Sequence, residues 1–195
     1  MKILKLSSII LLSSLAFSAH SAVVTFDDAS TTTSYENILD GYAGFNWGGM
    51  YVMQPVPAGY SDSGYNTGRV SGDFVAWNYA PTTVSAASGG TFDFTGAHFA
   101  SAWIANLDIV IEGWSAGSQL FSDTISIVDT GPTWFGANYA GIDQLKIIGS
   151  NNFVLDDFTY NENLPGVPIP AAAFMFAPAL LGFMGLRRRA KNAVA

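Results

Sequence analysis

Hydrophobic and polar residues alternate over short stretches in the middle of the chain. Residues 91–95 read Thr-Phe-Asp-Phe-Thr and residues 122–127 read Ser-Asp-Thr-Ile-Ser-Ile, which is the period of two expected for half-buried β-strands. Other stretches are rich in β-branched and aromatic residues and end at Gly, Pro, Asn or Ser. These patterns predict ten strands, at residues 23–27, 44–52, 73–79, 91–95, 98–104, 107–112, 119–122, 124–128, 142–148 and 152–160.

The same region lacks the pattern of an amphipathic helix. Between residues 22 and 165 no apolar stripe at helical spacing persists beyond about two turns. Many short strands without helices favour an all-β fold, and about 140 residues are enough for one hydrophobic core. We therefore expect residues 23–163 to form a single domain, an antiparallel two-sheet sandwich of the jelly-roll type.

An apolar stretch also lies close to the N-terminus. Lys2 and Lys5 precede apolar residues 6–17, and small residues follow. This order is typical of a secretory signal peptide, and a run of about 12 residues is too short to span a bilayer. We expect residues 1–22 to be this signal peptide, cleaved at Ala19-His20-Ser21 or after Ala22.

A second apolar stretch, residues 169–186, is followed by Arg187, Arg188 and Arg189. Its length, about 18 residues, is close to the minimum for a transmembrane helix, and the basic residues orient such a helix with its C-terminal end in the cytoplasm. We expect residues 164–195 to form a tail that contains this helix. A plain single-pass anchor would have the same length and flanking charge.

The tail resembles the PEP-CTERM sorting signal of Gram-negative bacteria, in the variant with the motif Val-Pro-Leu-Pro-Ala. The end of the signal is matched by residues 180–187, and the motif by Val167, Pro168, Ile169, Pro170 and Ala171. The Glu of a Pro-Glu-Pro core is missing. The resemblance implies that an exosortase in the inner membrane cleaves near the motif and passes the protein to the cell surface or the extracellular matrix.

Charge is distributed unevenly along the chain. All fifteen acidic residues lie between residues 22 and 166, together with only two basic residues, Arg69 and Lys146, so this region has a formal charge of −13. A domain this acidic repels phosphate backbones, which argues against nucleic acid as a partner. It attracts divalent cations instead.

Few residues of the domain suit catalysis. The chain has no cysteine, and His98 is the only histidine after residue 22, which excludes thiol catalysis and multi-histidine metal sites. Residues 113–117, Gly-Trp-Ser-Ala-Gly, match the nucleophile elbow of hydrolases, but that elbow needs a following helix and a later histidine. Because residues 118–122 have a strand pattern, we interpret residues 113–117 as a hairpin turn. We assign no role to His98.

Two pairs of aspartates interrupt apolar strands near the ends of the predicted domain. Asp27 and Asp28 follow Val-Val-Thr-Phe, and Asp156 and Asp157 stand between Phe-Val-Leu and Phe. A carboxylate in apolar surroundings needs hydrogen bonds or a metal ion. Pairing of the first and last strands would bring the four aspartates together, and calcium prefers such oxygen ligands. Capping of turns by the aspartates is the alternative.

Residues 90–160 also resemble the β-sandwich module of exported PEP-CTERM proteins and of carbohydrate-binding jelly rolls. The resemblance is carried by residues 91–94, 109–113, 141–145 and 153–158. Many carbohydrate-binding jelly rolls hold a structural calcium ion at their terminal strands. The resemblance therefore implies calcium as a cofactor at the four aspartates named above.

Aromatic residues are concentrated in one segment. Residues 41–79 contain nine aromatic residues and eight glycines. A ring with an apolar face and a polar edge suits stacking on a sugar. Phe74 and Trp77 lie in a predicted strand and are expected in the core. Tyr60 and Tyr65 lie in a loop of Gly, Ser and Asn, so we expect them to be exposed and to bind glycan.

These features predict an exported, non-enzymatic protein of the cell surface or exopolysaccharide matrix, with a structural or adhesive role and a glycan-binding surface. Its expected partners are the exosortase, the inner membrane during transit, and exopolysaccharide. Two alternatives remain open. One is a secreted glycan-active hydrolase, which would need two carboxylates facing each other across a cleft. The other is a membrane-anchored periplasmic protein that keeps its tail.

Overall fold

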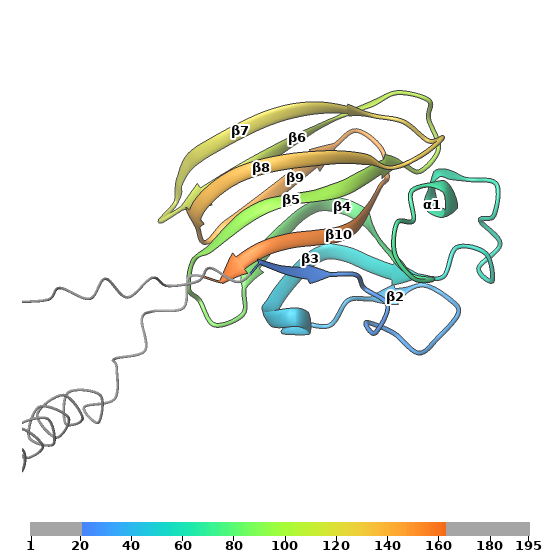
Figure 1. Cartoon of the computed structure of the whole chain (residues 1–195), viewed down its shortest axis with the longest axis horizontal. Coiled ribbons are helices and arrows are strands. Elements are labelled where there is room, and N and C mark those ends of the chain that lie inside the picture. Colours follow the sequence, from blue (N-terminus) through green and yellow to red (C-terminus); the bar gives the residue numbers. More distant parts are fainter. Residues whose placement is uncertain (1–20, 163–195) are drawn as a thin grey trace, which may run out of the picture. The chain divides into compact units, whose positions relative to one another are not determined.

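Ten antiparallel strands and a single turn of α-helix make up most of the structure, a computed structural model that describes residues 21–162 (Figure 1). The helical turn is α1 (Gly64–Thr67), and a 3₁₀ turn spans Tyr42–Gly44. The strands are β1 (Ser21–Val24), β2 (Glu36–Asn37), β3 (Phe45–Met53), β4 (Val75–Ala86), β5 (Phe92–Ser101), β6 (Leu107–Ser115), β7 (Ser118–Ile127), β8 (Thr133–Ile142), β9 (Gln144–Gly149) and β10 (Phe153–Glu162). The prediction of an all-β fold is confirmed.

The predicted sorting segments lie mostly outside this part of the chain. Residues 1–20 of the expected signal peptide, the motif at residues 167–171, and the helix at 169–186 with its basic end all fall there. Among residues 21–162 no helix has the length and apolar character needed to cross a bilayer. Strand β1 begins at Ser21, two residues before the expected start of the domain.

The strands form one continuous hydrogen-bonded sheet. The order along its main path is β7-β6-β9-β4-β10-β5-β8, with β3 paired to β4, β2 to β3, and β1 to β10. Strand β4 belongs to both layers, because Ala76 and Trp77 pair with β10 whereas residues 82–85 pair with β9. Pro81, which lacks an N–H group, lies in the stretch between these two ladders. The sequence pattern predicts two separate sheets, whereas the structure has a single sheet whose two layers are joined through β4.

The two ends of this sheet meet each other, which closes the fold (Figure 1). Phe121 of β7 stacks on Tyr139 of β8 with ring centroids 4.7 Å apart. The Tyr139 hydroxyl lies 2.6 Å from an Asp123 carboxylate oxygen, to which it donates a hydrogen bond. Burial and this bond raise the pKa of Tyr139. Strands at opposite ends of the path are thus held face to face over the core.

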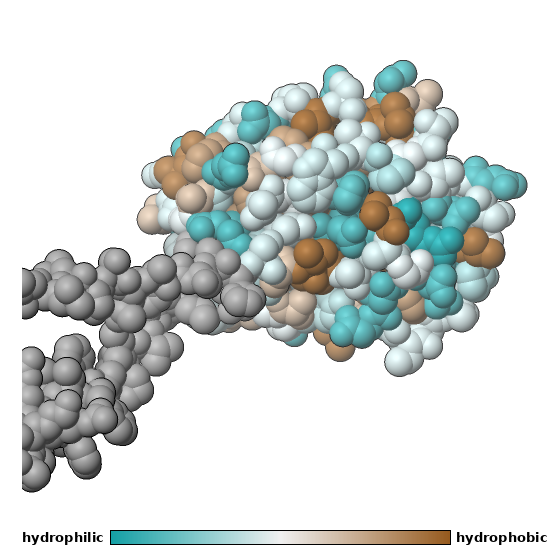
Figure 2. All heavy atoms as spheres, in the orientation of Figure 1, coloured by the Kyte–Doolittle hydropathy of each residue, from teal (hydrophilic) through white to brown (hydrophobic). Residues whose placement is uncertain are grey.

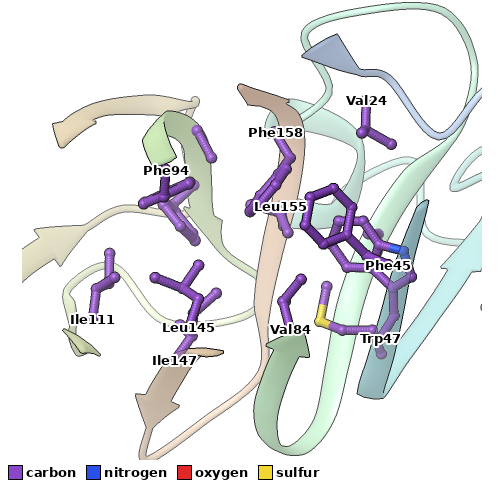
Figure 3. Close-up of a cluster of buried hydrophobic side chains, with 14 of the residues drawn as sticks. Val24, Phe45, Trp47, Val84, Phe94, Ile111, Leu145, Ile147, Leu155 and Phe158 are labelled. Atoms are coloured by element: carbon purple, nitrogen blue, oxygen red, sulfur yellow. The ribbon is translucent and has the colours of Figure 1, made fainter. Parts of the chain in front are cut away.

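The core between the layers is rich in aromatic rings (Figure 3). Phe45 of β3 is 2% exposed and packs edge-on against four rings, at centroid distances from 4.6 to 5.7 Å. Each such pair adds about 0.5–1.5 kcal/mol to the hydrophobic burial of the rings. These four neighbours come from three strands and tie the layers together: Trp47, Phe92, Phe158 and Tyr160.

A smaller cluster covers the opposite, outer face of the sheet. The segment between β3 and β4, residues 54–74, folds over this face and carries α1. The residues of this outer cluster that lie in strands alternate along those strands with residues of the main core, as the period of two requires. The buried members are Met53, Tyr65, Val75, Trp77, Ala100, Ala102 and Val154.

Several predicted strands differ in extent from the observed ones. Predicted strands 91–95 and 98–104 form the single strand β5, which runs through Gly96, and predicted strands 119–122 and 124–128 form β7. Strand β8 is missing from the prediction. Its outward positions include Gly136 and Asn138, which are depleted in strands, although Phe135, Ala137 and Tyr139 face the core.

The prediction of a hairpin at residues 113–117 is confirmed. Ser115 ends β6 and pairs with Ser118 at the start of β7. The two turn residues, Ala116 and Gly117, have φ values of 50° and 77°, as a type I′ turn requires. A strand follows the serine in place of the helix that a nucleophile elbow needs.

Candidate functional site

The outer face of the sheet carries a hollow lined almost entirely by aromatic rings, which we call the aromatic groove. Its volume is about 420 Å³, and it is bordered by side chains from β3, β4, the segment before β2, and the segment between β3 and β4. The lining residues are Tyr35, Tyr51, Met53, Tyr60, Tyr65, Trp77 and Tyr79.

One wall of the aromatic groove is built by cross-strand pairing. Tyr51 of β3 lies directly opposite Trp77 of β4, and their rings stack with centroids 5.1 Å apart. Tyr79, two residues along β4, meets Tyr51 edge-on at 6.0 Å, and Tyr35 meets Trp77 edge-on at 5.9 Å. Residues two apart on a strand share a face, so strand geometry itself aligns these rings.

The other wall comes from the segment that covers the sheet. Tyr65 of α1 packs at 5.3 Å from Tyr60 and at 5.6 Å from Trp77. Its hydroxyl accepts a hydrogen bond of 3.0 Å from Asn152 Nδ2, and burial raises the pKa of Tyr65. Trp103, which follows β5, meets both Tyr60 and Tyr65 edge-on. The two walls are therefore one continuous set of ring contacts.

Exposed rings gather at this groove. Tyr79 is 74% exposed, Tyr35 56% and Trp103 52%. Within residues 21–162 the only other aromatic side chain of comparable exposure is Trp134, which packs against His98. On the face shown in Figure 2, strongly hydrophobic residues form small, separate patches. Two of the three exposed rings, Tyr35 and Tyr79, line the groove, and Trp103 lies beside it against Tyr60 and Tyr65.

Tyr60 and Tyr65, the two tyrosines singled out from the sequence, both line the aromatic groove. The expectation that Tyr65 is exposed is wrong: it is 3% exposed, because α1 presses it onto the sheet beneath Trp103. Tyr60 is half-buried. Phe74 lies in the main core as expected, whereas Trp77 lies in the outer cluster.

The sequence reasoning missed most of the other rings. Tyr51 and Tyr79 lie in the aromatic-rich segment and share a side of paired strands, which is the signal that could have found them. Tyr35 and Trp103 lie outside that segment: Tyr35 is in no predicted strand, and Trp103 is in predicted strand 98–104 but follows the end of β5 in the structure. Only the folded chain brings those two to the groove.

The predicted metal ligands Asp27 and Asp156 hold one segment of backbone. An oxygen of Asp156 accepts hydrogen bonds from the N–H groups of Val70 and Ser71, at 2.7 and 3.0 Å. An oxygen of Asp27 accepts from the N–H groups of Asp73 and Phe74, at 2.8 and 3.2 Å. These carboxylates therefore fix residues 70–74, which continue the segment that carries Tyr60 and Tyr65.

Asp28 and Asp157 contact other parts of the domain. Asp28 accepts a hydrogen bond of 2.6 Å from the Tyr42 hydroxyl, beside a hollow of about 500 Å³ that Asp27 also borders. Asp157 sits in a β-bulge with φ 50°, and its carboxylate lies 3.9 Å from Nδ1 of His98. The bulge interrupts the alternation along β10 and returns Phe158 to the core.

The four aspartates do not gather into one site. No group of three or more His, Cys, Asp or Glu side chains in the described part of the chain is placed to hold a metal ion. Calcium takes six to eight oxygen ligands, and three of the four carboxylates already accept hydrogen bonds from the protein. The shared site expected from the sequence does not fit this arrangement, and calcium binding stays a prediction.

Asp156 is the most perturbed of these carboxylates. Its side chain is fully buried, and burial raises its pKa to about 6. The N–H groups of Val70, Ser71 and Asp157 act in the opposite direction, since they stabilise the charged form. The Ser71 hydroxyl donates to it as well, at 3.2 Å. The loss of hydration on burial raises the pKa of Asp156 more than these hydrogen bonds lower it.

No protein-family model matches the sequence, and no curated protein matches it either. Among solved structures, the chain is similar to the N-terminal CBM22-1-CBM22-2 tandem domain of Xyn10C from Paenibacillus barcinonensis, with 12% identity and a TM-score of 0.44 over 79% of this chain and 49% of that chain. It is also similar to TmCBM61 in complex with β-1,4-galactotriose, with 9% identity and a TM-score of 0.31 over 64% of this chain and 90% of that chain. This chain thus spans about half the length of the tandem-domain structure.

Proposed function

We propose that the domain binds glycans through the aromatic groove. The observation that carries this proposal is a hollow lined by aromatic rings, of which Tyr35 and Tyr79 are exposed, with the exposed ring of Trp103 beside it against Tyr60. A sugar ring presents an apolar face of C–H groups and a polar edge of hydroxyls. Tyrosine and tryptophan offer the matching combination of a flat face and a hydrogen-bonding tip.

We propose binding without cleavage. Glycoside hydrolases generally place two carboxyl groups on either side of the bond that they cut. Within residues 21–162, the side chains that line the aromatic groove include no carboxylate. The hairpin at residues 113–117 likewise offers no elbow for a serine nucleophile. We also propose that the fold is a sandwich of the jelly-roll type, which the antiparallel pairing of its strands supports.

The test is a comparison of matched variants on immobilised glycans. Replacing Tyr35 and Tyr79 by Ala removes two exposed rings, each contributing about 1 kcal/mol to stacking, so binding should weaken about tenfold or more. Trp134→Ala removes an exposed ring elsewhere and should leave binding unchanged. Affinity electrophoresis in gels containing hydroxyethylcellulose, galactan or xylan measures retention, and the melting temperature reports stability. Equal retention of both variants would contradict the proposal.

The tail supplies the second part of the proposal. We propose that the protein is exported, recognised by an exosortase in the inner membrane, and delivered to the cell surface or exopolysaccharide matrix, where the groove holds polysaccharide in a structural or adhesive role. Support comes from the motif at residues 167–171, the apolar run and the three arginines. Mass spectrometry of the mature C-terminus distinguishes cleavage near the motif from a retained anchor.

A further inference from the structure

A second hollow lies next to the aromatic groove, and we call it the polar hollow. Its volume is about 430 Å³. It is lined by hydroxyl and carboxyl side chains of the segment before α1 and of the connection between β7 and β8, together with one ring. The lining side chains that matter here are Ser61, Asp62, Trp103, Asp129 and Thr130.

Trp103 connects the two hollows. It lines the polar hollow, and its ring also lies 5.8 Å from Tyr60 and 5.3 Å from Tyr65, both of which line the aromatic groove. The side chain is 52% exposed. A ligand that leaves the aromatic groove past Tyr60 therefore meets an open ring face and then a polar surface.

The walls of the polar hollow are fixed before any ligand arrives. The Gly64 N–H donates to the Ala102 carbonyl at 3.0 Å, and a Cβ atom on Gly64 would lie 1.7 Å from the Ser101 carbonyl oxygen. Asn66 Nδ2 donates to the Ser61 carbonyl, and the Thr67 hydroxyl donates to the Asp129 carbonyl. Because these contacts already hold α1 in place, ligand binding would order few further residues and would lose little conformational entropy.

The carboxylates in the polar hollow are free to accept hydrogen bonds. Most other aspartates of the domain accept bonds from the protein, as Asp93 does from Gly141 N–H and Asp143 from Ala116 N–H. Within residues 21–162, the side chains of Asp62 and Asp129 take part in no hydrogen bond or ion pair. Sugar hydroxyls donate well to such carboxylates.

The charge of this surface selects the class of glycan. Both cations of the described chain lie away from the two hollows: Arg69 pairs with Asp73 at 2.9 Å, and Lys146 lies over the Trp114 ring. Neither hollow is lined by a Lys or Arg side chain among residues 21–162. A glycan that carries carboxylate or sulfate groups would meet Asp62 and Asp129 without a compensating cation.

We propose that the ligand is a neutral polysaccharide whose chain runs from the aromatic groove across Trp103 into the polar hollow. This inference rests on the proposed function. The sugar units in the groove stack on rings, and the units beyond Trp103 donate hydroxyl hydrogen bonds to Asp62 and Asp129. The two hollows are then subsites of one extended site, and chain length determines how many of them a ligand fills.

The first experiment addresses the class of ligand. Retention of the wild-type protein is compared in gels containing hydroxyethylcellulose, galactan or xylan and in gels containing polygalacturonate, at low ionic strength. We expect at least one neutral polysaccharide to retain the protein and polygalacturonate to leave it unretained. Retention on polygalacturonate equal to that on the best neutral glycan would overturn the inference and leave the proposed function standing. Failure of every neutral glycan would overturn both.

The second experiment addresses the polar hollow. Calorimetry compares oligosaccharides of three and six units, cut from the neutral polysaccharide that binds best. The double variant Asp62→Ala/Asp129→Ala should bind the six-unit chain at least fivefold more weakly and the three-unit chain as tightly as wild type. The control Asp40→Ala/Asp108→Ala removes two exposed charges elsewhere and should change neither. An unchanged affinity of the first variant for the six-unit chain, with wild-type stability, would show that the hollow is not a subsite.

Discussion

The buried carboxylate of Asp156 should make the stability of the domain depend on pH in an unusual direction. Its pKa in the folded protein is about 6, against 3.8 for an unperturbed aspartate. The folded state therefore binds this proton more tightly than the unfolded state does. The stabilisation from protonation is fully present below pH 3.8 and is lost as the pH rises through 6. The difference of about two pKa units corresponds to about 3 kcal/mol.

The variant Asp156→Asn isolates this contribution, because asparagine does not titrate. Its amide oxygen can still accept from the N–H groups of Val70 and Ser71. Its NH₂ group replaces the oxygen that accepts from Asp157 N–H at 2.8 Å, so two donors would face each other. This clash lowers stability by a similar amount at every pH. The wild type should therefore gain about 3 kcal/mol relative to the variant between pH 7.5 and pH 3.5.

Urea unfolding of both proteins at intervals across this range measures the difference directly. General effects of acid on the other carboxylates cancel, since both proteins share them. Asp40→Asn, at an exposed position, serves as the control and should follow the wild-type profile. A difference that stays constant with pH would refute the reasoning. So would a wild type that loses stability relative to Asp156→Asn on acidification, because the hydrogen bonds would then outweigh desolvation.

Two further predictions concern the outer face and the metal. Gly64→Ala places a Cβ atom 1.7 Å from the Ser101 carbonyl oxygen, so it should lower the free energy of unfolding by about 1–3 kcal/mol and weaken glycan retention. The control Gly131→Ala, with open space around it, should change neither. A urea midpoint of Gly64→Ala equal to that of the wild type would show that α1 packs loosely on the sheet. Asp27, Asp28 and Asp156 already accept hydrogen bonds from the protein, so EDTA should leave the melting temperature unchanged. If calcium raises the melting temperature and Asp27→Asn abolishes that increase, the metal site predicted from the sequence is present.

The sequence predicted the fold class because period-two alternation is a local signal. The predicted ends of strands were wrong at a proline and at a glycine that lie inside a strand. Pro81 lies in β4 where neither ladder needs its N–H group, and Gly96 lies in β5 where a Cβ atom would meet the Phe135 carbonyl at 2.3 Å. Such residues usually end a strand. Only the pairing of neighbouring strands shows that these two do not.

The candidate site was predicted in part for a similar reason. Loop composition pointed to Tyr60 and Tyr65, but burial of Tyr65 depends on α1 and Trp103, which lie far apart in sequence. The aspartates were correctly recognised as unusual, because an acid inside an apolar strand needs a partner. The partners of Asp27 and Asp156 are backbone N–H groups within residues 70–74, and the partner of Asp28 is the Tyr42 hydroxyl. A sequence pattern does not show whether a buried carboxylate is stabilised by hydrogen-bond donors of the protein or by a bound cation.

The pairing of β1 with β10 fixes where an attachment would pull on the domain. Ser21 lies opposite Asn161, so both chain ends of the described domain leave from one end of β10. Asn152, just before the other end of β10, holds the Tyr65 hydroxyl in the aromatic groove. Ten residues of strand span about 30 Å. A domain tethered through either terminus would therefore hold the Tyr65 end of the aromatic groove about 30 Å from the tether, and a ligand of the groove would not have to lie against the surface to which the domain is attached.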